Sequence, residues 1–131
     1  MAPYMPLPRE DIQQVVESFY RKALRDAMIG FHFRHIQDLS THIPRLTSFW
    51  ELQLNGQTTH PLDHPFSLIP THQKMGIKRG QLDRWVVLFK QTLQETFSNQ
   101  NDKSEQWAQI WSENIDRFRL LFTRHLQLSR S

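Results

Sequence analysis

The sequence predicts an all-α protein, and three observations support this prediction. Apolar residues recur at intervals of three and four residues in four separate stretches, which is the spacing of one buried helical face. No stretch shows the strict alternation of apolar and polar residues that indicates a β-strand. The length of 131 residues suits one domain with its own core, so we expect a single helical domain over residues 1–131.

The first helix is predicted after an extended, proline-containing lead-in over residues 1–8. Tyr20 lies on its apolar face and therefore points inward, where an unpaired hydroxyl would cost about 1–3 kcal/mol. Gly30 is expected to interrupt the helical stretch, and residues 31–33 are expected to form a short connecting turn in which Phe33 could line a cavity. The predicted buried face consists of Ile12, Val15, Val16, Phe19, Tyr20, Ala23 and Leu24.

The second helix is expected to begin near Ser40 or Thr41 and to end near Leu54. Pro44 is tolerated because its missing amide donor falls within the first turn. The residues predicted to face inward are His42, Leu46, Phe49, Trp50 and Gln53.

Residues 55–79 lose the helical periodicity, because prolines and glycines interrupt them repeatedly. We expect only one short helical turn there, around Pro70 to Met75. An irregular segment of this length inside a small domain is usually functional, and this one contains three histidines: His60, His64 and His72.

Two further helices are predicted after this segment. The first has an apolar face of Leu82, Trp85, Val86, Phe89, Leu93 and Phe97. Asp102 and Glu105 form a capping-box pattern that begins the second. Its predicted buried face consists of Trp107, Ile110, Trp111, Ile115, Phe118, Leu121 and Phe122.

The composition restricts the possible chemistry. The absence of cysteine excludes disulfides, iron–sulfur clusters and thiolate-bound haem, and leaves seven histidines as the main supply of metal ligands. The net charge of +3 is mild and dispersed, which does not call for nucleic acid as a partner. No apolar stretch is long enough to cross a membrane and no export signal is evident, so we expect a cytoplasmic protein.

Three motifs in order resemble the truncated haemoglobins, and among them the third, bacterial group. They are Phe19-Tyr20, then His42 to Arg45 with Phe49-Trp50, then Arg84 to Phe89, and the resemblance covers residues 11–125. It implies a two-over-two helical sandwich, the truncated globin fold, around a b-type haem, with a long irregular segment before the proximal histidine. It also implies that Tyr20 and His42 form the distal pair and that Trp85 lies along the haem.

The proximal histidine is where the sequence departs from the family pattern. Counting back from Trp85 by the usual interval reaches His72, whereas counting forward from Trp50 reaches Leu68, midway between His64 and His72. An insertion before a preserved final segment reconciles the two counts, so His72 is the predicted iron ligand and His64 the alternative. The implied haem pocket consists of Tyr20, Phe33, His42, Arg45, Leu46, Phe49, Trp50, His72, Lys74, Trp85 and Phe89.

The resemblance implies a haem protein that binds oxygen, carbon monoxide or nitric oxide, with oxygen binding and transport or redox detoxification as its use. Arg45 and Lys74 are candidates for pairing the haem propionates. Catalytic turnover would need a separate reductase, so the sequence does not decide whether the protein is an enzyme. The alternatives are a globin-like domain that has lost haem and acts as an interaction or sensory module, and a plain helical protein without a ligand.

Overall fold

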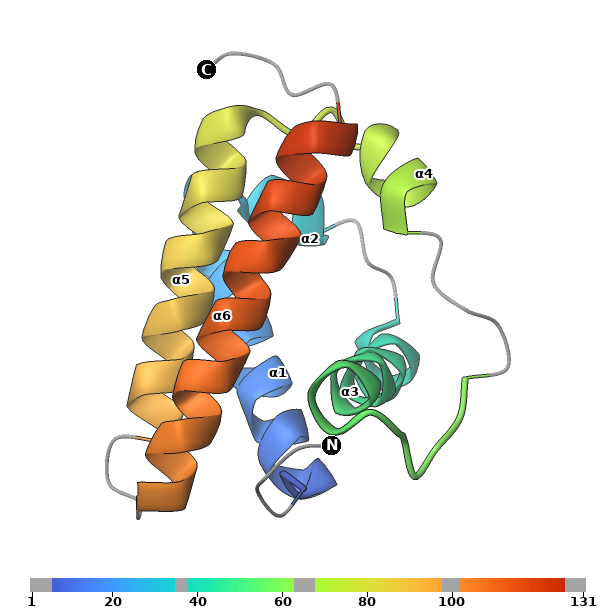
Figure 1. The fold of residues 1–131 in the computed structure, drawn as a ribbon. Helices are drawn as coiled ribbons and strands as arrows, with labels where there is room; N and C mark the ends of the chain where they lie inside the picture. The colour runs from blue at the N-terminus through green and yellow to red at the C-terminus, as the bar shows by residue number, and fades with distance from the viewer. Residues whose placement is uncertain (1–5, 35–37, 63–67, 98–101, 127–131) are drawn as a thin grey trace.

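The computed structural model describes residues 6–34, 38–62, 68–97 and 102–126 (Figure 1). These residues form six helices and no β-strand, which confirms the predicted all-α class. None of the described helices is long and apolar enough to span a membrane. The helices are α1 (Arg9–Arg25), α2 (Gly30–Arg34), α3 (Leu39–Asn55), α4 (Leu68–Gln73), α5 (Arg79–Phe97) and α6 (Asp102–His125).

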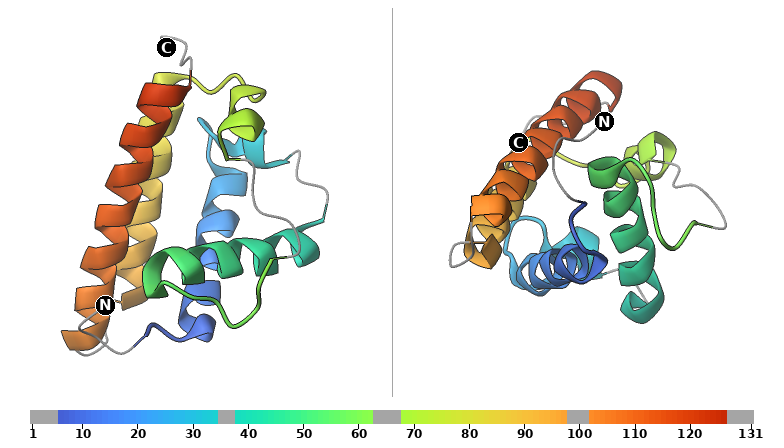
Figure 2. Two further views of the ribbon diagram at one scale, coloured as in Figure 1. Left: turned by 45° about the vertical axis from the view of Figure 1, so that its right-hand side comes forward. Right: turned by 60° about the horizontal axis from the view of Figure 1, so that its bottom comes forward.

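The four long helices form two layers. Helices α5 and α6 run antiparallel, and α1 packs against both α5 and the crossing helix α3 (Figures 1 and 2). This is the two-over-two arrangement that the resemblance to truncated haemoglobins implied. The short helices α2 and α4 lie at the end where α6 finishes, and α4 is on the same side of the α5–α6 pair as α3 (Figure 2).

The core lies where α1, α3, α5 and α6 meet. Phe19 of α1, Phe97 of α5 and Trp111 of α6 are almost completely removed from water. Six of the seven predicted inward positions of α1 are buried, and Leu24 is partly buried. Helical periodicity alone therefore identified this face, because burial of apolar surface is the main force that fixes a helix in a small domain.

The chain does leave the helical conformation after α1, but at residues 26–29 and not at Gly30, which is the first residue of α2. The prediction of a connecting turn over residues 31–33 is wrong, because these residues lie within α2. The turn before it is formed by Asp26, whose carboxylate accepts hydrogen bonds from the backbone N–H groups of Met28 and Ile29 at 2.9 and 3.2 Å. A Cβ at Gly30 would lie 3.0 Å from the carbonyl oxygen of Leu24. The absence of a side chain at Gly30 thus allows α2 to pack closely on α1, and the interruption between the two helices lies before this glycine.

The inward face of α3 also differs from the prediction at one position. Gln53 is exposed, whereas Thr47, Ser48 and Glu51 are buried. The helix begins at Leu39, where the carboxylate of Asp38 accepts from the Thr41 N–H, and ends at Gly56 in a left-handed conformation with φ of 79°.

The buried carboxylate of Glu51 joins three segments. Its Oε1 accepts from Arg9 Nη1 at 3.0 Å, from Thr58 Oγ1 at 2.7 Å and from the Thr59 N–H at 3.0 Å. Burial opposes ionisation of Glu51, but these hydrogen bonds outweigh it and hold the pKa of the carboxyl below its usual value. The Arg9–Glu51 pair therefore fixes the start of α1 and the chain after α3 onto α3.

Candidate functional site

A hydrogen-bonded tyrosine and histidine lie between α1 and α3. Tyr20 is 8% exposed, and its Oη is 3.1 Å from Nε2 of His42. The buried hydroxyl predicted from the sequence thus has its partner on the neighbouring helix. Burial raises the pKa of Tyr20 far above its usual value, while burial and then the charge of Arg45 lower the pKa of His42. Both side chains are consequently neutral near pH 7.

Aromatic rings surround this polar pair. The ring of Phe33, from α2, is 5.2 Å from the Tyr20 ring and nearly perpendicular to it. Phe19 lies behind both, with centroid distances of 5.8 Å to Tyr20 and 5.7 Å to Phe33. Such edge-to-face contacts are favourable and directional, so they hold the orientation of the Tyr20 ring.

A second group of rings extends from α3 and α5 to α6. Trp50 contacts Phe89 at 5.5 Å and Phe118 at 5.3 Å, and Trp85 contacts Phe89 at 5.6 Å. Several large side chains that pack on this core nevertheless remain partly exposed, which leaves apolar surface for a ligand to cover. These partly buried residues include Phe33, Leu46, Phe49, Trp85 and Phe118.

His72 lies on α4, next to the end of α6. Its ring centroid is 4.8 Å from that of Phe122, and the side-chain amide Nε2 of the following residue, Gln73, donates to the carbonyl oxygen of His125 at 3.3 Å. Ile69 of the same helix packs on a small cluster formed by Leu82, Phe122 and Leu126. Helix α4 covers Leu68–Gln73, so it begins two residues before the predicted turn.

The structure brings most of the predicted pocket residues together. Tyr20, Phe33 and His42 form one contact group, and Phe49, Trp50, Trp85 and Phe89 form another. Lys74, in the turn after α4, is exposed, and Arg45 and Leu46 are partly buried on α3. His64 lies outside the described residues.

Ring contacts connect the two predicted sides of the pocket. From His72 they run through Phe122 and Phe118 to Trp50, and onward through Phe89 and Phe19 to Tyr20.

Three aromatic residues at this site were not among the predicted pocket residues. Phe118 and Phe122 were assigned only to the buried face of the last helix, and Phe19 only to that of the first. Phe118 and Phe122 are four residues apart on a helix and therefore adjacent on one face. That spacing was a usable signal for a continuous aromatic wall, but it did not show which helix this wall would face.

Two layers of helices with a Tyr–His pair beside a cluster of aromatic side chains are the arrangement expected of a globin-type protein. The family model for bacterial-like globins matches residues 8–116, so this chain belongs to the bacterial-like globin family. No curated protein and no solved structure matches the chain. The matched range contains every predicted pocket residue, whereas Phe118 and Phe122 lie just beyond it.

Proposed function

We propose that this protein binds haem b between the α1–α3 layer and helices α4 and α6, and uses it to bind a diatomic gas. The observation that carries the proposal is the Tyr20–His42 hydrogen bond, in which a buried tyrosine meets a partly buried histidine beside large aromatic side chains that remain partly exposed. A flat apolar group with two acidic substituents fits this lining, because it would cover the rings and leave its charged edge near Arg45.

His72 would hold the metal. With no cysteine in the chain, a neutral imidazole is the strongest donor available, and His72 is the histidine of α4, across the aromatic wall from Tyr20. Bound haem would supply an iron atom with one open position for a gas molecule. Arg45 and Lys74 would pair with the propionates.

Tyr20 would act as the hydrogen-bond donor on the gas side. Its high pKa keeps the phenol protonated, so a proton is always present to donate. The proposal needs neutral His42 in the tautomer that carries its proton on Nε2, so that the imidazole would donate to the Tyr20 oxygen across the 3.1 Å contact and leave the phenol proton for the gas. A buried hydrogen bond of this type is worth about 1 kcal/mol or more, which corresponds to a several-fold slower release of a polar gas such as oxygen.

Use of the bound gas in redox or detoxification chemistry would require an external electron donor, so we propose a reductase as a partner for any catalytic cycle.

Titration of the purified chain with haemin tests the proposal. We expect a sharp Soret band that saturates at one haem per chain and, after reduction, a carbon monoxide complex. His72→Ala should abolish the normal ferrous carbonyl spectrum, whereas His60→Ala, at an exposed position, should leave it unchanged. Loss of the spectrum only in His64→Ala would identify His64, and not His72, as the iron ligand. The absence of a saturable band would refute haem binding and favour a haem-free module.

The role of Tyr20 is tested separately by the rate of oxygen release from the ferrous protein. Tyr20→Phe removes only the hydroxyl, so we expect release to become several-fold to tenfold faster. An unchanged rate would refute a hydrogen bond from Tyr20 to the bound gas but would leave the proposal of haem binding intact.

A further inference from the structure

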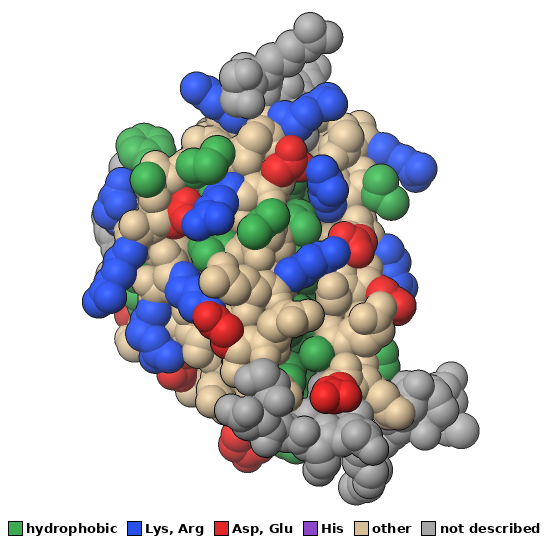
Figure 3. All heavy atoms as spheres, turned by 90° about the vertical axis from the view of Figure 1, so that its left-hand side faces the viewer, with side chains coloured by type: hydrophobic (Ala, Val, Ile, Leu, Met, Phe, Trp, Pro, Cys, Tyr) green, Lys and Arg blue, Asp and Glu red, His purple; other side chains and the backbone are tan. Residues whose placement is uncertain are grey.

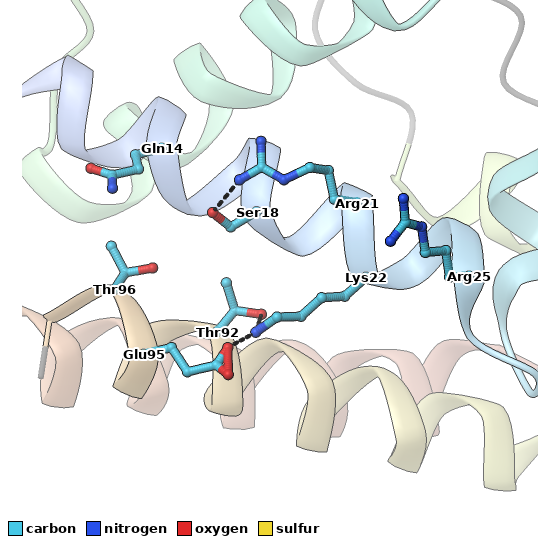
Figure 4. Close-up of a pocket in the computed structure, with 8 residues that line it drawn as sticks. All are labelled: Gln14, Ser18, Arg21, Lys22, Arg25, Thr92, Glu95 and Thr96. Carbon is cyan, nitrogen blue, oxygen red and sulfur yellow. Dashed lines mark hydrogen bonds and ion pairs between the residues drawn. The ribbon is translucent and has the colours of Figure 1, made fainter.

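A polar groove lies between α1 and α5, separate from the proposed haem pocket (Figure 4). Its volume is about 360 Å³, at the lower end of the range for small-molecule sites. The lining residues are Gln14, Ser18, Arg21, Lys22 and Arg25 from α1, and Thr92, Glu95 and Thr96 from α5.

The groove is on the side of α1 away from the haem pocket. At 3.6 residues per turn, the α1 residues that line it point roughly opposite to Tyr20. Tyr20 points toward α3, where its hydroxyl meets His42. A ligand in the groove would therefore not compete for the haem site.

Positive charge dominates the lining, with three cationic side chains against the single carboxylate of Glu95. Arg21 and Arg25 are four residues apart and therefore adjacent on α1, where like charges repel. Arg21 donates to Ser18 Oγ at 3.1 Å, but within the described residues neither guanidinium forms an ion pair with a carboxylate. Lys and Arg side chains also gather along one edge of the face that contains α5 (Figure 3).

Lys22 crosses the groove. Its ammonium forms an ion pair with Glu95 and donates to Thr92 Oγ1 at 3.3 Å (Figure 4). The side chain of Lys22 is 30% exposed and that of Glu95 is 52% exposed. Glu95 is therefore the more exposed member of the pair, on the side from which an entering anion could take its place beside the ammonium.

We propose that this groove binds a small molecule carrying a phosphate or pyrophosphate group, held by Arg21, Lys22 and Arg25. Guanidinium groups match phosphate oxygens with paired hydrogen bonds, and a phosphate carries enough charge to engage several cations at once. The volume exceeds what inorganic phosphate alone would fill, which favours a phosphorylated small molecule. Glu95 acts as the competing anion that the ligand displaces.

Calorimetric titration of the full chain with inorganic pyrophosphate at low ionic strength tests this site. Arg25→Gln and Arg21→Gln should each weaken binding about fivefold or more, because each removes one charge contact. Glu95→Gln should strengthen binding severalfold, because it removes the competing carboxylate. The matched controls are Lys90→Gln and Asp116→Asn, which alter an ion pair between α5 and α6 that does not line the groove.

Opposite effects of Arg25→Gln and Glu95→Gln, with the controls close to wild type, would support the site. Equal effects of groove and control variants would show that pyrophosphate is attracted only by the general surface charge, and would overturn the proposal. No detectable binding at millimolar pyrophosphate would also overturn it, and succinate binding as tightly as pyrophosphate would overturn the assignment to phosphate. Each result is independent of haem binding, because the titration needs no haem.

Discussion

The two sides of the proposed haem pocket are built differently. On the distal side, Tyr20 and His42 stand on two helices of 17 residues each that pack against one another, with Phe19 fully buried behind them. On the proximal side, His72 stands on a six-residue helix, and the contacts of its described residues include Ile69 on the Leu82 cluster, the His72–Phe122 ring contact and the hydrogen bond from Gln73 to the end of α6.

This difference suggests that the distal residues are held in a fixed orientation, whereas the proximal helix can adjust when a ligand binds. The distal residues are oriented before any ligand arrives, because core packing and the Arg9–Glu51 pair fix α1 on α3. None of the four described side chains of α4 is fully buried, because Thr71 and Gln73 are exposed and Ile69 and His72 are partly buried. We therefore expect a ligand bound by His72 to add order to this helix. A short helix with few buried contacts belongs to the least stable part of a domain.

Core truncation should show the largest contrast between the two sides. Phe19→Ala deletes a fully buried ring and should lower the free energy of unfolding by about 3–5 kcal/mol. Ile69→Ala trims a partly buried side chain of α4 and should cost less than about 1 kcal/mol in the haem-free protein. Urea denaturation of the two variants measures both values. Similar losses would contradict the distinction between a rigid and a weakly held side.

The Arg9–Glu51 pair should give the next largest effect. Glu51→Gln leaves Arg9 without its buried counter-charge and should cost about 2–3 kcal/mol at pH 7, below the usual range for buried pairs because Arg9 is 17% exposed. Asp83→Asn breaks the exposed pair with Arg119, at 46% and 47% exposure, and should cost less than about 0.5 kcal/mol. Equal costs measured by thermal or urea unfolding would refute a special role for Glu51.

The lowered pKa of Glu51 also predicts that the protein loses stability at acidic pH. Its pKa in the folded protein is lower than the value of about 4.3 in an unfolded chain. The stability it contributes is therefore complete above that value and is lost as the pH falls through the lower, folded-state pKa. Between pH 5 and 3 the wild-type protein should lose more stability than Glu51→Gln, and parallel pH profiles would contradict this assignment.

The smallest change in the free energy of unfolding is expected for the Tyr20–His42 pair. Tyr20→Phe should cost about 0.5–1.5 kcal/mol, because one part-buried hydrogen bond is lost. His42 has a lowered pKa when folded, so its contribution is present above the unfolded value of about 6.5 and is lost as the pH falls through the folded-state pKa. Replacing His42 by Gln should flatten the stability profile between pH 7 and 5, and an unaltered slope would contradict a partly buried, neutral imidazole.

The fold could be predicted where helical periodicity was strong. The faces of α1, α5 and α6 repeat apolar residues over several turns, and burial of those faces determines how the helices pack. Helix α2 was not predicted, because its glycine favours a break by local propensity, whereas tertiary contacts stabilise the helix: the Asp26 turn, close packing on α1 and the His32–Gln81 hydrogen bond to α5. Local sequence does not contain those tertiary contacts.

The site was predictable in part for the same reason. Tyr20 and His42 lie on periodic helices, so their inward direction could be predicted, and the resemblance supplied their pairing. Glu51 could not be recognised as buried, because its partner Arg9 is 42 residues away and a carboxylate is normally expected at the surface. The position of His72 depended on counting through an irregular segment, where no periodicity fixes the register.

Hydrogen–deuterium exchange of the full chain, with and without one equivalent of haemin, tests the central claim most directly. The account predicts that peptides covering α4, residues 68–73, exchange rapidly in the haem-free protein and become strongly protected when haemin is added. Peptides from the middle of α1 and α3 should be protected in both states. Haemin that leaves α4 unchanged, or that mainly alters α1 and α3, would contradict a preformed distal side and a proximal helix ordered through His72.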